Sequence, residues 1–106
     1  MERVGFLLKV KQELIPEYVK HHEAVWPEMQ DALRRTGWHN YSLFMREDGL
    51  VFGYFETPHS FQAAVEAIEK EEINARWDEF MAPYLEAVNA ATGEIMLELE
   101  QIFHLD

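Results

Sequence analysis

The chain has 106 residues, no cysteine, and a formal net charge of −11 from 20 acidic and 9 basic side chains. This length fits one domain, residues 1–106, and 48 % hydrophobic residues suffice for a buried core. The lack of cysteine excludes disulfides, thiolate metal ligands and thiol nucleophiles. The acidity disfavours nucleic acid as a partner, because its phosphates would be repelled. These properties fit a protein that handles a small neutral or cationic ligand.

Neither a secretory signal nor a membrane span is recognisable. The first residues lack a basic segment followed by a long apolar run. No apolar stretch approaches the roughly 20 residues that cross a bilayer. A chain without cysteine also fits a reducing compartment. We expect a cytoplasmic protein with no membrane partner.

The first third of the chain predicts a strand followed by a broken helix. Apolar side chains recur at every second position over 3–10, which is typical of a strand with one buried face. From 14 to 36 the spacing becomes helical. Pro27 lies inside this span, where it removes a backbone donor and clashes with the preceding turn. We therefore expect a kink or break near Trp26.

The middle of the chain predicts a β-hairpin. Residues 38–46 and 50–57 are aromatic-rich alternating runs. The turn sequence Glu47-Asp48-Gly49 separates them, and such a sequence favours a tight reversal between two strands.

The last part predicts two helical segments and a final strand. A helix is expected after Pro58-His59-Ser60, interrupted by the acidic run 69–72 and resumed over 73–87. Residues 94–103 alternate acidic and apolar side chains, so a strand is expected there. Its apolar side chains, Ile95, Leu97 and Leu99, should point inward. Its acidic side chains, Glu94, Glu98 and Glu100, should point outward.

The order β-α-β-β-α-β predicts an α+β, ferredoxin-like fold, with one antiparallel sheet and helices on one face. The other face must meet solvent, ligand or a second chain. Phe, Leu and Tyr are frequent in the strands, so simple exposure is unfavourable. We expect a homodimer, as in dimeric α/β barrels.

The most informative motif is a helical stripe of Tyr18, His22 and Trp26. These positions are four residues apart and lie on one face of a helix. Together they offer hydrogen bonding, proton transfer near neutral pH and an aromatic wall, which suits a sugar. The alternative is a stripe of core aromatics with a half-buried histidine, and spacing alone favours that alternative.

Other groups carry weaker signals. His21 diverges from His22 by about 100° on a helix, so the two cannot face one pocket or share a metal. Residues 37–41 mix polar and aromatic side chains at the start of a strand, which predicts either a cavity wall or a dimer contact. Within 74–79, Trp77 suits the core and its charged neighbours suit solvent. No metal site is predicted.

Taken together, Tyr18-x3-His22-x3-Trp26-Pro27-Glu28 and His39-Asn40-Tyr41-Ser42 resemble the L-rhamnose mutarotase family. The resemblance continues through Arg76-Trp77 and the ending Glu100-Gln101-Ile102-Phe103-His104-Leu105-Asp106, so it spans nearly the whole chain. It implies a dimeric ferredoxin-like enzyme that interconverts the α and β anomers of L-rhamnose without a cofactor.

The resemblance also implies roles for individual residues. His22 takes the acid/base position, while Tyr18 and Tyr41 take sugar-binding positions. Trp77 matches the first of two adjacent tryptophans that contact sugar. Asp78 stands where the family has the second, which bears on which sugar hydroxyls are accepted. Trp26 is expected to form a further apolar wall. With Asp78 in place of the second tryptophan, the preferred sugar stays open between L-rhamnose, L-fucose and another deoxyhexose.

The sequence also leaves two other classes of function open. Cofactor-free monooxygenases and haem-degrading proteins share the expected dimeric fold, although fold alone carries little functional weight. A non-enzymatic sugar-binding module would show ligand-dependent stabilisation without faster anomer exchange.

Overall fold

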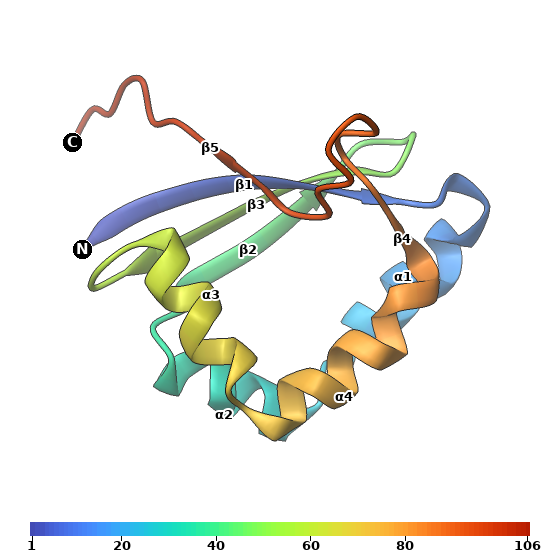
Figure 1. The fold of residues 1–106 in the computed structure, drawn as a ribbon, viewed down its shortest axis with the longest axis horizontal. Coiled ribbons are helices and arrows are strands. Elements are labelled where there is room, and N and C mark those ends of the chain that lie inside the picture. Colours follow the sequence, from blue (N-terminus) through green and yellow to red (C-terminus); the bar gives the residue numbers. More distant parts are fainter.

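A curled antiparallel sheet and four helices on one of its faces make up the structure, a computed structural model that describes all residues 1–106 (Figure 1). The strand order is β2-β3-β1-β4, and β5 also pairs with β1. The strands are β1 (Glu2–Val10), β2 (His39–Met45), β3 (Leu50–Thr57), β4 (Leu85–Glu86) and β5 (Leu97–Leu99). The predicted α+β, ferredoxin-like architecture is confirmed.

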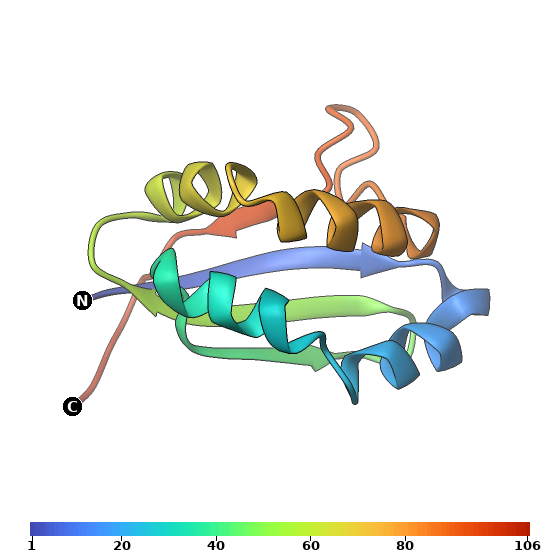
Figure 2. The same cartoon turned by 90° about the horizontal axis from the view of Figure 1, so that it is seen from below.

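The helices form two rows beneath the sheet, α1 with α2 and α3 with α4 (Figure 2). Both predicted interruptions are present. Trp26 has an extended backbone because a residue before proline avoids the helical region, and Pro27 then begins α2. Glu71 is likewise extended between α3 and α4. The helices are α1 (Ile15–His22), α2 (Pro27–Arg35), α3 (Phe61–Glu69) and α4 (Glu72–Met81), with short 3-10 turns at Gln12–Leu14 and Ala82–Tyr84.

Alternate side chains of β1 make the centre of the core. Those that point toward the helices are buried, and Phe6 is fully so. The Phe6 ring lies over Gly53 of β3, where an added Cβ would come within 2.2 Å of it. Beside it, Trp38 stacks on Phe55 with ring centroids 4.0 Å apart, and its indole N–H donates to the carbonyl of Ala64 in α3. The core therefore joins the hairpin to the helical layer.

The C-terminal part departs from the expectation. The helix predicted over 73–87 ends at Met81, and the strand predicted over 94–103 is limited to Leu97–Leu99. Leu97 pairs with Leu7 of β1, and Leu99 pairs with Gly5. Directly opposed residues of an antiparallel pair share a face, so both leucines lie on the face away from the helices. The predicted inward orientation of Leu97 and Leu99 is therefore wrong.

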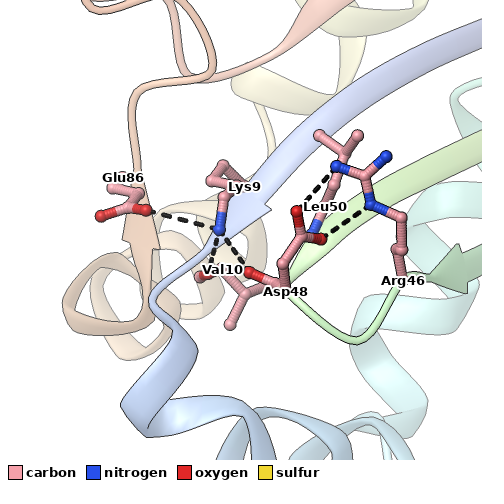
Figure 3. A network of polar contacts seen from close by, with 6 residues as sticks. All are labelled: Lys9, Val10, Arg46, Asp48, Leu50 and Glu86. Carbon is pink, nitrogen blue, oxygen red and sulfur yellow. Dashed lines mark hydrogen bonds and ion pairs between the residues drawn. The ribbon is translucent and has the colours of Figure 1, made fainter.

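At one end of the sheet, Lys9 ties three segments together (Figure 3). Its ammonium group donates to the backbone carbonyls of Val10 and Asp48 and lies 3.6 Å from the carboxylate of Glu86. Arg46 contacts the Asp48 carboxylate through two nitrogens, at 2.9 and 2.7 Å. These contacts hold β1, the β2–β3 turn and β4 in register.

The four helices are short, and none combines the length and the hydropathy that a membrane-spanning helix requires.

Candidate active site

A cavity of ≈ 1400 Å³ lies between the sheet and the helices. Its sheet side is lined from β1, β2 and β3, and its helix side from all four helices. Most of the lining is apolar, and the remainder is polar or charged, including Glu23, Arg34 and Glu69. The lining includes five of the six residues predicted for the site, namely Tyr18, His22, Tyr41, Trp77 and Asp78.

His22 ends α1 with one ring nitrogen bound and the other free of protein partners. Its Nδ1 lies 2.9 Å from the backbone carbonyl oxygen of Tyr18. A carbonyl oxygen can only accept, so Nδ1 carries the proton. In the neutral ring, Nε2 is then an available proton acceptor. Burial lowers the pKa of His22, as does the charge of neighbouring His21, and the hydrogen bond to Tyr18 opposes this only in part.

Two phenols reach the same cavity from opposite layers. Tyr18 is buried on α1, with its ring centroid 4.3 Å from that of His22. Its hydroxyl has no protein partner, yet no buried side-chain polar atom is left unpaired, so the hydroxyl reaches open space in the cavity. Burial raises the pKa of Tyr18 to about 12. Burial, and secondarily the nearby Tyr18, also raises the pKa of Tyr41 on β2. Both phenols therefore keep their protons at neutral pH.

The two tryptophans of the helical layer occupy different positions. Trp77 on α4 lines the cavity, and its ring meets the His22 ring edge-on with centroids 5.5 Å apart. Trp26 does not line the cavity. It packs behind Trp77 at 4.9 Å and stacks on Phe80 at 5.3 Å. Trp26 thus supports the wall that Trp77 forms.

Asn74, which the sequence pattern does not assign to the site, lies beside Asp78 at the cavity. The two are one helical turn apart on α4, and the Asn74 amide donates to Asp78 over 3.1 Å. Burial raises the pKa of Asp78, the hydrogen bond from Asn74 lowers it, and nearby Glu69 raises it. The spacing of Asn74 from Trp77 and Asp78, three and four residues, is the signal that places it on the same helix face.

The adjacent histidines diverge as predicted. The His21 ring packs edge-on against Phe80 at 4.5 Å, and its Nε2 lies 3.0 Å from the hydroxyl of Tyr84. Neither His21 nor Tyr84 lines the cavity. Nowhere do three His, Asp or Glu side chains gather in a metal-binding arrangement.

The arrangement joins a neutral imidazole, two protonated phenols and an indole wall in one largely apolar cavity. An imidazole with a free nitrogen can accept a proton near neutral pH. Phenols can donate or accept hydrogen bonds to hydroxyl groups, and indole faces pack on C–H surfaces. The site suits a small, uncharged, polyhydroxylated molecule that undergoes proton transfer.

Comparisons with known proteins point the same way. A family model described as L-rhamnose mutarotase matches residues 3–105. The L-rhamnose mutarotases of Oceanobacillus iheyensis, Lactiplantibacillus plantarum and Bacillus subtilis are 34 %, 33 % and 32 % identical, and each alignment covers 100 % of both chains.

Two solved structures share the fold. A crystal structure of an L-rhamnose mutarotase from Formosa agariphila superposes with a TM-score of 0.80 at 24 % identity, covering 100 % of both chains. A crystal structure of an antibiotic biosynthesis monooxygenase gives a TM-score of 0.62 at 16 % identity, covering 96 % of this chain and 99 % of the other.

Proposed function

The chain belongs to the L-rhamnose mutarotase family, and on that premise we propose that it interconverts the α and β anomers of L-rhamnose or of a closely related deoxyhexose such as L-fucose. The observation that carries the proposal is the free Nε2 of His22, which belongs to a cavity-lining imidazole whose other nitrogen is held by a backbone carbonyl. An enzyme for anomer exchange needs such a base and a means of protonating the ring oxygen.

The reaction needs two proton transfers in each direction. Nε2 of His22 accepts the proton of the anomeric hydroxyl, and the C1–O5 bond breaks as the ring oxygen gains a proton. The open-chain aldehyde then rotates about C1–C2. O5 attacks the other face of C1 and loses its proton, while the carbonyl oxygen regains one, so the net change is only the configuration at C1.

The neighbouring groups assist these transfers. The Tyr18 hydroxyl, or a water held by it, donates toward the ring oxygen, since burial keeps this phenol protonated. Tyr41 orients sugar hydroxyls from the sheet side. Trp77 packs against a C–H face of the sugar. Asp78 accepts hydrogen bonds from sugar hydroxyls at the edge of the same wall. The residues supply all of these steps by hydrogen bonding and proton transfer.

Polarimetry tests the proposal. Freshly dissolved crystalline L-rhamnose relaxes to its equilibrium rotation at a rate set by spontaneous ring opening. We expect the protein to accelerate this relaxation in proportion to its concentration. A relaxation rate unchanged by the protein would leave a sugar-binding module as the better description.

We further propose that two copies pair through the open face of the sheet. Phe44 and Phe52 lie opposite each other there, 62 % and 40 % exposed, and Leu99 is 36 % exposed. An apolar patch of this kind on a sheet is typical of an interaction surface. A homodimer would cover it without closing the cavity on the other side.

We also propose a cytoplasmic location, because a chain without cysteine fits a reducing compartment.

A further inference from the structure

Helix α4 places a polar pair, Asn74 and Asp78, beside the aromatic and apolar side chains that it contributes to the cavity wall, Trp77 and Met81. Asn74 is only 7 % exposed, and its neighbours on the same helix face, Trp77 and Met81, are also buried. Asp78 lies one turn further along, at the more exposed edge of the cavity. A buried amide costs free energy unless its donors and acceptors find partners.

The hydrogen bond between the two side chains leaves their remaining oxygens free. A carboxylate only accepts, so the Asn74 NH₂ group must face Asp78, which fixes the orientation of the amide. The Asn74 Oδ1 atom and the Asp78 Oδ1 atom then have no protein partner. Since no buried side-chain oxygen is left unpaired, the Asn74 oxygen has access to open space, and the cavity is the space that this residue lines.

Two neighbouring acceptors of this kind match two neighbouring hydroxyl donors. The 3.1 Å hydrogen bond between Asn74 Nδ2 and Asp78 Oδ2 holds the two side chains together, so their free Oδ1 atoms are neighbours on α4, as vicinal hydroxyls are neighbours on a sugar ring. In a pyranose ring, the C3–C4 bond lies opposite the C1–O5 bond that opens. With C1 and O5 at His22 on α1 and the ring against Trp77, C3 and C4 face away from the base.

We propose that Asn74 and Asp78 form a positioning subsite that binds the C3 and C4 hydroxyls of the sugar. This inference rests on the proposed function for the placement of C1. It assigns substrate selection to the pattern of hydroxyls on C3 and C4, and it makes Asn74 a specificity-determining residue beside Asp78. Both residues bind the sugar without exchanging protons with the reacting bond.

The test combines variants with deoxygenated ligands. Binding of L-rhamnose and of its 2-deoxy, 3-deoxy and 4-deoxy analogues is measured by calorimetry on the wild-type chain, Asp78→Asn and Asn74→Ala. The exchange rate at saturating sugar is measured on the same samples by NMR. Glu79→Gln, an exposed residue of α4 that does not line the cavity, is the matched control.

We expect Asp78→Asn to weaken the binding of L-rhamnose and 2-deoxy-L-rhamnose by about 10-fold, the effect of losing a hydrogen bond to a charged group. The exchange rate should fall through this weaker binding, so raising the sugar concentration should recover most of the loss. The 3-deoxy or 4-deoxy analogue should already bind weakly to the wild type and lose little more in the variant. Asn74→Ala should show the same ligand pattern.

Each contrary outcome has a distinct meaning. Equal weakening of all four ligands, or no weakening of any, overturns the subsite. A wild type that shows the expected ligand pattern but no exchange overturns the proposed function and leaves the subsite standing. A wild type that binds none of the sugars overturns both.

Discussion

Nδ1 of His22 lies 2.9 Å from the backbone carbonyl oxygen of Tyr18, one turn earlier in α1. This contact decides which nitrogen of the ring holds the proton, because the carbonyl cannot donate. It also ties the proposed base, His22, to the same helical turn as Tyr18, the phenol proposed to assist it. A single segment of eight residues, α1 (Ile15–His22), thus positions both groups.

His22→Gln should reduce exchange to about a hundredth of the wild-type rate or less, because the amide can hydrogen-bond but cannot act as a base. His21→Gln is the matched control, since His21 packs outside the cavity against Phe80 and Tyr84. NMR exchange rates of both variants check this. Full activity in a folded His22→Gln protein would remove His22 from the mechanism.

The exchange rate should be flat above pH 7 and fall on acidification. Burial lowers the pKa of His22 from its ordinary value of 6.5, so the ring is neutral at pH 7. The base form is lost only as the pH drops through that lowered pKa, and the midpoint of the decline should lie below 6.5. The rate profile, corrected for spontaneous exchange, and an NMR titration of the His22 ring measure it. A midpoint above 6.5 would contradict the described environment.

Tyr18→Phe should slow exchange at least about 10-fold while leaving the fold intact, because the hydroxyl has no protein partner to lose. Tyr84→Phe is the counterpart. Its hydroxyl contacts His21 at 3.0 Å outside the cavity, so its loss should cost about 1 kcal/mol of unfolding free energy and leave exchange unchanged. Denaturant unfolding and exchange rates separate the two. Identical effects of the two substitutions would argue against a specific role for Tyr18.

Substitutions should also distinguish the role of Trp77, which lines the cavity, from that of Trp26, which does not. Trp77→Phe should weaken sugar binding, since a smaller ring covers less of the C–H face in the cavity. Trp26→Phe should leave binding unchanged and lower the unfolding free energy by about 1 kcal/mol, because Trp26 packs behind Trp77 rather than lining the cavity. Calorimetry with L-rhamnose and denaturant unfolding measure both. Weaker sugar binding by a stable Trp26→Phe protein would give Trp26 a direct contact.

The sequence predicted those features of the fold and the site that depend on local spacing. Pro27 predicts the break between α1 and α2, and the alternation of apolar side chains along β1 predicts its buried face. The positions of Tyr18 and His22 on one helix face follow from their separation of four. The orientation of Leu99 could not be predicted, because it depends on which residue of β1 the last strand meets, and alternation alone leaves both faces possible.

The same limit applies to the site. Trp26 continues the stripe of Tyr18 and His22, but the break at Pro27 ends the helix before it, so the expected periodicity no longer holds at that position. Asn74 was missed because a single polar residue in a helix is ordinarily solvated. Asn74 is buried because α4 packs across the cavity, and this tertiary packing cannot be predicted from a local sequence pattern.

Phe44→Glu should convert the proposed dimer into a monomer, because a carboxylate would be buried against Phe52 and the facing copy. Gln62→Glu, on the exposed surface of α3, is the charge-matched control and should leave the dimer intact. Light scattering after size-exclusion chromatography gives the mass of each. A wild type with the mass of one chain, or an unchanged mass for Phe44→Glu, would contradict pairing through this face.

Saturation-transfer NMR on equilibrated L-rhamnose tests the central claim most directly, because it measures anomer exchange with no net reaction. Irradiating the H1 resonance of one anomer should diminish that of the other when the wild-type chain is present. The transfer should grow with protein concentration, and His22→Gln should abolish the gain. Transfer no greater with the wild-type chain than in buffer would contradict the assignment of mutarotase activity to this cavity.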